Sequence, residues 1–186
     1  RGLIGSFGLR AVAVSVDGGS EREWRQMALP GPGSASPLGV PHVPEHGPLV
    51  VLCGPMGSGK TAVGGALARR WGVDLHDSDA AVAALAGMSV PEIFASQGEA
   101  TFRALEHQVV LDALATHRGV LSLGGGAVTH AGTRAALADY RASGGVVVFL
   151  DLRPEHAAQR IGSGRGRPLL GADPLARWLE ISRERR

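Results

Sequence analysis

The chain has 186 residues, enough for one domain and a tail, and 44% of them are apolar, so a hydrophobic core can form. Its formal net charge of +2 is too small to indicate a nucleic-acid or membrane-surface partner. The single cysteine, Cys53, excludes an internal disulfide and suits a reducing, cytosolic compartment. No apolar run approaches the roughly 20 residues that a membrane-spanning helix needs.

The first 47 residues differ in composition from the rest of the chain. Six of the eleven prolines lie between Pro30 and Pro48, mixed with glycine and serine. Such a stretch buries little apolar surface and cannot continue a helix or a strand ladder. We therefore expect residues 1–47 to be a disordered or linker-like extension, and residues 48–186 to form the domain.

From Pro48 onward, short apolar runs alternate with helical patterns. Each run has the continuity of a parallel strand that is buried on both faces. Gly72 marks the end of the first helix, Ser89 and Glu92 have the spacing of a capping box, and Gly98 ends the helix that they start. In chain order, we expect strands at residues 49–53, 73–76, 120–123 and 146–150, and helices at residues 61–71, 89–98, 99–116, 133–140, 154–161 and from 174 to the chain end. This alternation predicts a three-layer α/β/α fold built on a parallel sheet.

Residues 54–61, GPMGSGKT, match the phosphate-loop pattern GxxxxGK[ST]. Its glycines let backbone N–H groups turn toward phosphate oxygens, and the helix that follows points its N-terminus at the same anion. Lys60 can reach the outer phosphates, and the Thr61 hydroxyl can ligate magnesium. A chance glycine turn is the alternative, but a buried strand before the loop and a helix after it favour the phosphate loop. The pattern predicts an ATP and Mg²⁺ site that includes Gly57, Ser58, Gly59, Lys60 and Thr61.

Three short motifs follow the loop. DSD at residues 77–79 comes after the second strand, FRALE at residues 102–106 lies in a helix, and LGGGA at residues 123–127 closes the third strand. Together with residues 162–170, which end in RPLL, they resemble the shikimate kinase family over roughly residues 48–186. The resemblance implies the P-loop kinase fold of the nucleoside monophosphate kinase type. The glycine triplet and the FRxxE element are specific only in combination.

The resemblance also implies a role for each motif residue. Asp77 matches the aspartate that helps to hold magnesium, and Asp79 matches the one that contacts the phosphorylated hydroxyl group. Carboxylate oxygens suit both tasks, because one is a hard ligand and the other can orient or deprotonate a hydroxyl. Arg103 matches the arginine that clamps the shikimate carboxylate, a planar group that a guanidinium fork binds well, and Glu106 can hold it in place. The backbone expected to contact the substrate belongs to Gly124, Gly125 and Gly126.

Each of these residues also has a purely structural interpretation. Asp77 or Asp79 could simply cap the next helix, which would not exclude function. Arg103 and Glu106 could form a solvated surface ion pair of little energetic value. The three glycines could form only a turn between a strand and a loop. The coincidence of the motifs favours the functional interpretation.

Three arginines near the end of the chain complete the resemblance. Arg167 matches the catalytic arginine of a lid over the phosphates, and Arg160 matches a position near the adenine, although a basic flexible loop is the alternative. Arg186 falls at the position of a second arginine for the substrate carboxylate. The family continues with a further strand beyond this point. We therefore expect that edge strand and part of the adenine pocket to be missing, which would leave the strand at residues 146–150 unpaired.

The implied activity is transfer of the γ-phosphoryl group of ATP to the 3-hydroxyl group of shikimate, in the chorismate pathway of aromatic amino-acid biosynthesis. Another P-loop kinase, acting on gluconate or on a nucleoside monophosphate, is the alternative enzyme. A second alternative is an inactive nucleotide-binding fragment. We expect a cytoplasmic monomer that uses ATP, Mg²⁺ and a small-molecule substrate, without nucleic-acid or membrane partners.

Overall fold

The computed structural model describes residues 14–15, 47–152, 156–157 and 174–184. Its elements in chain order are β1 (Val14–Ser15), β2 (Val50–Cys53), α2 (Lys60–Trp71), β3 (Leu75–Asp77), α3 (Ser78–Ala86), α4 (Val90–Thr116), β4 (Val120–Ser122), the 3-10 helix η2 (Ala127–Thr129), α5 (Ala131–Ala142), β5 (Val147–Asp151) and α7 (Pro174–Glu184). The four predicted strands are all present, and their ends are shifted by at most two residues.

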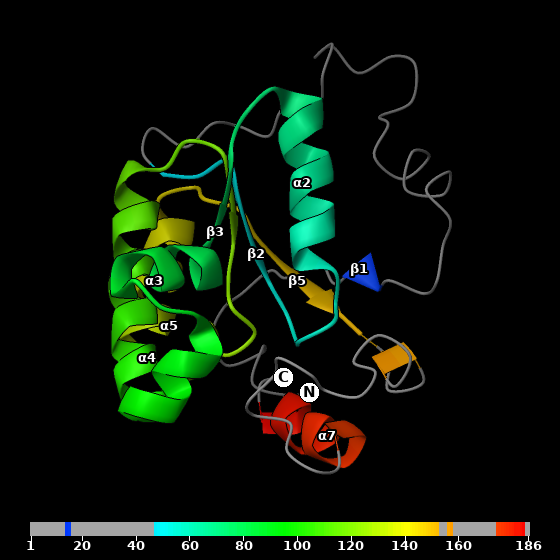
Figure 1. The fold of residues 1–186 in the computed structure, drawn as a ribbon. Coiled ribbons are helices and arrows are strands. Elements are labelled where there is room, and N and C mark those ends of the chain that lie inside the picture. The colour runs from blue at the N-terminus through cyan, green and yellow to red at the C-terminus, as the bar shows by residue number, and fades with distance from the viewer. Residues whose placement is uncertain (1–13, 16–46, 153–155, 158–173, 185–186) are drawn as a thin grey trace, which may run out of the picture.

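The sheet has the strand order β1-β5-β2-β4-β3, and every neighbouring pair is parallel. Successive residues of β2 face opposite sides of the sheet. Val51 and Cys53 join a core cluster with residues of α4 and α5, whereas Val50 and Leu52 pack with residues of α2. Accordingly, α2 covers one face of the sheet, and α4 and α5 cover the other (Figure 1). The prediction of a three-layer α/β/α fold on a parallel sheet is confirmed.

The outer edge of β5 is paired where the sequence predicted a free edge. Val14 and Ser15 pair in parallel with Leu150 and Asp151. The prediction of an unpaired edge is therefore wrong at these two positions. An edge strand presents a row of backbone N–H and C=O groups, and an extended segment of this chain can supply partners for them. Residues 1–13 and 16–46 lie outside the described residues, so the domain boundary near residue 48 stays a prediction.

Helix ends follow the expected signals. Gly72 caps α2 in the left-handed conformation, with φ 67°. At the start of α4, the backbone N–H of Ser89 donates to Oε2 of Glu92 over 2.7 Å, as a capping box requires. Gly98 has φ 82° and breaks α4 into the two helical parts that were predicted separately. Of the helix predicted at residues 154–161, only His156 and Ala157 are described, and both are helical.

Helix α3 was not predicted. The DSD motif was interpreted as the end of a strand, whereas its first aspartate also caps a short alanine-rich helix. Among the described residues, no single helix has the length and apolar composition to cross a membrane; α3 and α4 meet those criteria only together, and they are bent by 88° at the break between them.

Candidate active site

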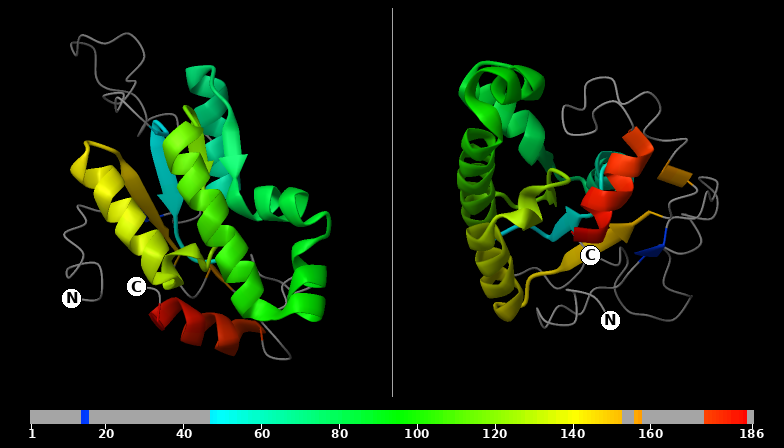
Figure 2. Two further views of the ribbon diagram at one scale, coloured as in Figure 1. Left: turned by 90° about the vertical axis from the view of Figure 1, so that its left-hand side faces the viewer. Right: turned by 90° about the horizontal axis from the view of Figure 1, so that it is seen from below.

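The phosphate loop connects β2 to α2 at the end of the sheet toward which the strands run, and α7 lies at the same end (Figure 2). Gly57 and Gly59 have φ values of 83° and 90°, and the backbone N–H of Ser58 donates to Pro55 O over 3.2 Å. Gly59 is the N-terminal cap of α2. The loop is therefore closed by its own backbone, and the N-terminus of the helix points into it.

Lys60 is buried within this loop, with 9% of its surface exposed. Its Nζ donates to the carbonyl oxygens of Gly54 over 2.8 Å and Pro55 over 3.0 Å. The two carbonyl dipoles replace part of the water shell of the ammonium group. The loop thus concentrates positive charge and N–H groups where phosphate oxygens would bind.

Thr61 and Asp77 lie side by side, although 16 residues separate them in the chain. The Thr61 hydroxyl donates to Oδ2 of Asp77 over 3.0 Å. Oδ1 of Asp77 accepts hydrogen bonds from the backbone N–H groups of Asp79, over 3.1 Å, and Ala80, over 3.4 Å. Asp77 therefore caps α3 with one oxygen and presents the other to Thr61. A helix cap and a metal ligand are compatible here.

A hydroxyl and a carboxylate at this spacing fit Mg²⁺, which prefers hard oxygen ligands and keeps part of its water and phosphate shell. The described residues contain no group of three or more His, Cys, Asp and Glu that could hold a metal ion.

Asp79 lies at the start of α3, where Gly124 approaches it closely. A Cβ atom added to Gly124 would collide with carboxylate oxygens of both Asp79 and Glu106, so a side chain at this position would displace them. Burial first, and then the neighbouring charge of Asp77, raise the pKa of Asp79, while Lys60 and Arg103 act in the opposite direction. A carboxylate with a raised pKa is a better proton acceptor than a free aspartate.

Ser78 holds Gly124 close to Asp79. The sequence did not predict this role. The Ser78 side chain is fully buried, and its Oγ accepts a hydrogen bond from the backbone N–H of Gly124 over 2.8 Å. The N–H of Gly124 is therefore engaged within the protein in this structure. The serine between two aspartates gave no separate signal, because its partner is 46 residues away.

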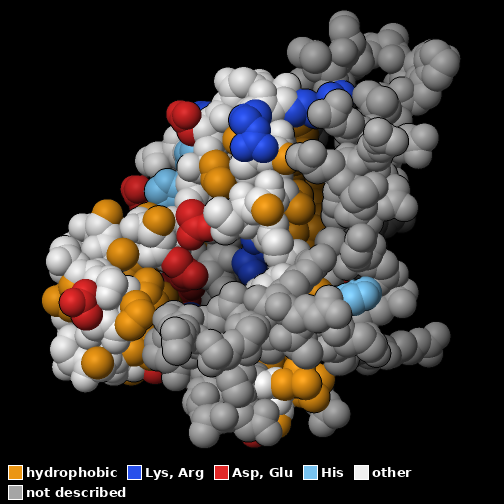
Figure 3. Space-filling model, turned by 45° about the vertical axis from the view of Figure 1, so that its right-hand side comes forward, with side chains coloured by type: hydrophobic (Ala, Val, Ile, Leu, Met, Phe, Trp, Pro, Cys, Tyr) orange, Lys and Arg blue, Asp and Glu red, His pale blue; other side chains and the backbone are white. Residues whose placement is uncertain are grey.

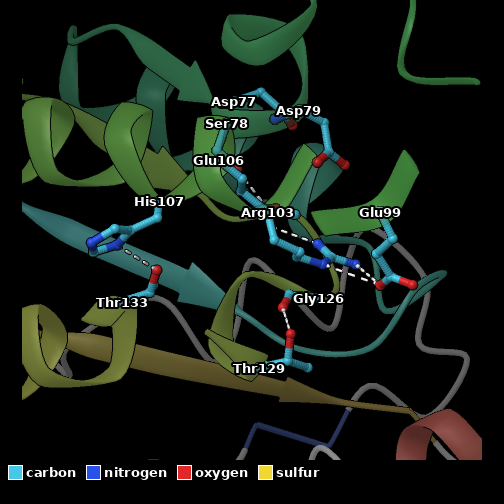
Figure 4. Close-up of polar contacts among 11 residues, drawn as sticks. Asp77, Ser78, Asp79, Glu99, Arg103, Glu106, His107, Gly126, Thr129 and Thr133 are labelled. Atoms are coloured by element: carbon cyan, nitrogen blue, oxygen red, sulfur yellow. Dashed lines mark hydrogen bonds and ion pairs between the residues drawn. The ribbon is translucent and has the colours of Figure 1, made fainter. Parts of the chain in front are cut away.

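Arg103 projects from α4 toward the glycine loop (Figure 4). Its NH1 donates to Oε2 of Glu106 over 2.5 Å, and Glu106 is only 1% exposed, so the interpretation as a solvated surface pair is wrong. Glu99 accepts from the other side of the guanidinium group. Gly126 lies directly against this group, because an added Cβ would overlap Arg103, and the Phe102 ring centroid is 5.1 Å from Cζ.

The phosphate loop and the glycine loop touch. A Cβ atom added to Gly125 would lie 3.3 Å from the backbone nitrogen of Met56. From the opposite end of the chain, the Trp178 indole N–H donates to Met56 O over 2.8 Å, a contact that the sequence analysis did not predict. Figure 3 shows acidic and basic side chains gathered around a hollow on one face of the molecule. The predicted residues Arg160, Arg167 and Arg186 lie outside the described residues.

A strand, a GxxxxGKT loop and a helix, set in a parallel sheet between two helical layers, define a P-loop kinase fold. Residues 56–186 match the family model described as shikimate kinase. The shikimate kinase of Thermobifida fusca is 51% identical over 138 residues, which cover 74% of this chain and 77% of that protein. The shikimate kinase of Streptomyces coelicolor is 47% identical over 139 residues, 75% of this chain and 78% of that one.

Solved structures agree with these relatives. The shikimate kinase of Acinetobacter baumannii in complex with shikimate has a TM-score of 0.68 and 34% identity, with 74% of this chain and 75% of that chain covered. The chain belongs to the shikimate kinase family.

Proposed function

We propose that this chain transfers the γ-phosphoryl group of ATP to the 3-hydroxyl group of shikimate, a step of the chorismate pathway. The observation that carries the proposal is the contact between the two loops: Gly125 lies against Met56, so a phosphate donor and a hydroxyl acceptor would share one wall. Asp79 and Arg103 would face the acceptor on the same side of that wall. Burial raises the pKa of Asp79, and the charge of Arg103 acts against that rise. Phosphoryl transfer depends mainly on such positioning and on charge stabilisation.

On the donor side, the loop N–H groups and Lys60 would bind the phosphates of ATP. Thr61 and Asp77 would hold Mg²⁺; Oγ1 of Thr61 lies 3.0 Å from Oδ2 of Asp77. The bound ion neutralises charge on the phosphate oxygens. Lys60 would exchange its two carbonyl partners for phosphate oxygens, which are stronger acceptors for an ammonium group.

On the acceptor side, Arg103 would hold the shikimate carboxylate, with Glu106 keeping the guanidinium group in place. Asp79 would accept the proton of the shikimate hydroxyl group while the oxygen of that hydroxyl group forms a bond to the γ-phosphorus. The bond from that phosphorus to the bridging oxygen breaks, and ADP leaves with the electron pair. Backbone of the Gly124–Gly126 loop would line the substrate, since a Cβ atom on Gly124 or Gly126 would overlap Asp79, Glu106 or Arg103.

Three arginines are included in the proposal only because of their positions in the family's motifs. Arg167 would neutralise charge on the transferred group, Arg160 would contact the nucleotide, and Arg186 would be a second partner for the substrate carboxylate. We further propose that the chain acts as a monomer in the cytoplasm. The location, but not the oligomeric state, is supported by Cys53, a buried free thiol of the kind that a reducing compartment preserves.

An assay of ADP release with shikimate tests the proposal. We expect ADP release that depends on shikimate and on Mg²⁺, and a product that carries phosphate on the 3-hydroxyl group. Gluconate and nucleoside monophosphates serve as competing acceptors, and Lys60→Ala serves as the inactive control. ADP release with gluconate or a nucleotide but not with shikimate would reject the proposal, as would a chain that binds ATP and transfers to none of them.

A further inference from the structure

Two carboxylates of the same helix hold the guanidinium group of Arg103 in different ways. NH1 donates to Glu106 Oε2 over 2.5 Å, and Glu106 is 1% exposed. On the other side, a single oxygen of Glu99 accepts from both Nε, over 3.4 Å, and NH2, over 3.3 Å. Glu99 is 51% exposed, and Figure 4 shows the two carboxylates at different sides of the group. The Glu106 pair is short and buried, whereas the Glu99 pair is long and open to water.

These differences set how readily each pair can be exchanged. Charge-assisted N–H···O bonds are usually about 2.7–2.9 Å long, so both contacts of Glu99 are weak. A pair between residues i and i+4 on an exposed helix surface contributes little to stability. Breaking the Glu106 pair would instead leave a buried charge without its partner, which is costly. Glu106 is therefore the permanent partner of Arg103, and Glu99 is the exchangeable one.

The Nε–NH2 edge that Glu99 occupies is also a natural site for a ligand carboxylate. Its two N–H groups are parallel and match the two oxygens of a planar carboxylate. NH1 already donates to Glu106, and Gly126 lies against NH2, Cζ and NH1 of the guanidinium group. A carboxylate that binds Arg103 in the bidentate mode would thus take the place of Glu99.

We propose that Glu99 competes with the substrate for Arg103: it occupies the carboxylate-binding edge of Arg103 in the free protein and is displaced by the carboxylate of the substrate. The inference rests on the proposed function, in which Arg103 binds that carboxylate. A charged substrate replaces one long, shared contact with two parallel bonds and restores the ion pair. A neutral ester has no charge to exchange for that of Glu99, so its binding leaves the Glu99 contact in place.

Calorimetric titration of two ligands tests the exchange. Shikimate carries the carboxylate, and its methyl ester is the neutral probe. Glu99→Gln keeps the size of the side chain and removes its charge. The matched control is Glu180→Gln, which removes the same charge from another exposed pair, Arg177–Glu180 on α7.

We expect Glu99→Gln to bind shikimate about two- to five-fold more tightly than the wild type, the range that corresponds to loss of an exposed ion pair. The dissociation constant of the methyl ester should stay the same in all three proteins, and Glu180→Gln should bind both ligands as the wild type does. Unchanged or weaker shikimate binding by Glu99→Gln would show that Glu99 only orients Arg103 and would overturn the inference. An equal gain for the ester would overturn it too. A wild-type chain that binds no shikimate would reject the proposed function itself.

Discussion

The phosphate loop and the acceptor cluster lie against each other, yet they are built in opposite ways. The loop is made of eight consecutive residues, and the partners of Lys60 are five and six positions away in the chain. The acceptor cluster joins the start of α3, the middle of α4 and the glycine loop, and its Ser78–Gly124 bond spans 46 residues. The phosphate loop is a local motif whose parts are neighbours in the chain. The acceptor cluster forms only when three elements pack together. Single substitutions should therefore affect the two sites in different ways.

The largest effect should come from the local site. Lys60→Ala removes the only side-chain charge inside the loop, and removal of a preorganised charge at the transferred group costs on the order of 10³-fold in turnover. Shikimate affinity should fall far less than turnover, because the hydrogen bonds from Lys60 to Gly54 and Pro55 stay within the loop, and Lys60 acts on Asp79 through its charge. Turnover from ADP release and calorimetry with shikimate measure the two quantities. Turnover near that of the wild type would contradict the role of Lys60.

The reverse pattern should follow from Arg103→Ala. Loss of one charged partner of a desolvated carboxylate costs on the order of 2–5 kcal/mol of binding free energy, here for shikimate, while ATP binding should be nearly unchanged. Separate calorimetric titrations with shikimate and with ATP measure the two changes in binding free energy. Equal losses for both ligands would mean that Arg103 supports the whole domain, because Glu106 would be left buried without its partner.

Asp79 belongs to the acceptor cluster and also feels the charge of Lys60 in the phosphate loop. Its substitution should lower turnover but raise stability. Asp79→Asn should lower turnover by about 10²-fold, more than it lowers shikimate affinity, because an amide cannot accept the hydroxyl proton. Wild-type turnover should fall as the pH decreases through the raised pKa of Asp79, since only the deprotonated form is a base. That dependence should be absent in the variant, as a pH profile of turnover would show.

The same raised pKa predicts the sign of the stability change. The folded chain binds the Asp79 proton more tightly than the unfolded chain does, so this group contributes stability at low pH that is lost as the pH rises through the folded pKa. At neutral pH the charged carboxylate destabilises the fold. Asp79→Asn should therefore melt at a higher temperature than the wild type at pH 7. A lower melting temperature would show that the carboxylate is needed for packing.

The smallest effect concerns packing between the segments of the acceptor cluster. Ser78→Ala leaves the buried N–H of Gly124 without an acceptor, which costs about 1–3 kcal/mol of unfolding free energy. Because Gly124 lies between Asp79 and Glu106, the Michaelis constant for shikimate should rise while that for ATP stays constant. Ser78→Thr keeps the hydroxyl group and should restore the Michaelis constant for shikimate, although its extra methyl group in this buried site lowers stability. If alanine and threonine behave alike, the hydrogen bond does not position the glycine loop.

The same contrast explains what the sequence could predict. The strands and the phosphate loop were found because apolar runs and the GxxxxGKT pattern are contiguous. The roles of Asp79, Arg103 and the glycines were predicted only through the resemblance to a family. Ser78, Glu99 and Trp178 were missed, since their importance comes from partners rather than from residue type. Strand β1 was missed because a two-residue pairing with β5 has no periodic signal.

The indole N–H of Trp178 reaches the carbonyl oxygen of Met56 in the phosphate loop, and the ring is almost completely buried. An indole is a fluorophore whose emission depends on the hydrogen bond and the polarity around it. Emission from Trp178 should therefore change when the backbone of the loop shifts, as it would on binding ATP. In a chain with Trp24→Phe and Trp71→Phe, Trp178 would be the remaining tryptophan and would give an optical signal of the loop without any attached dye.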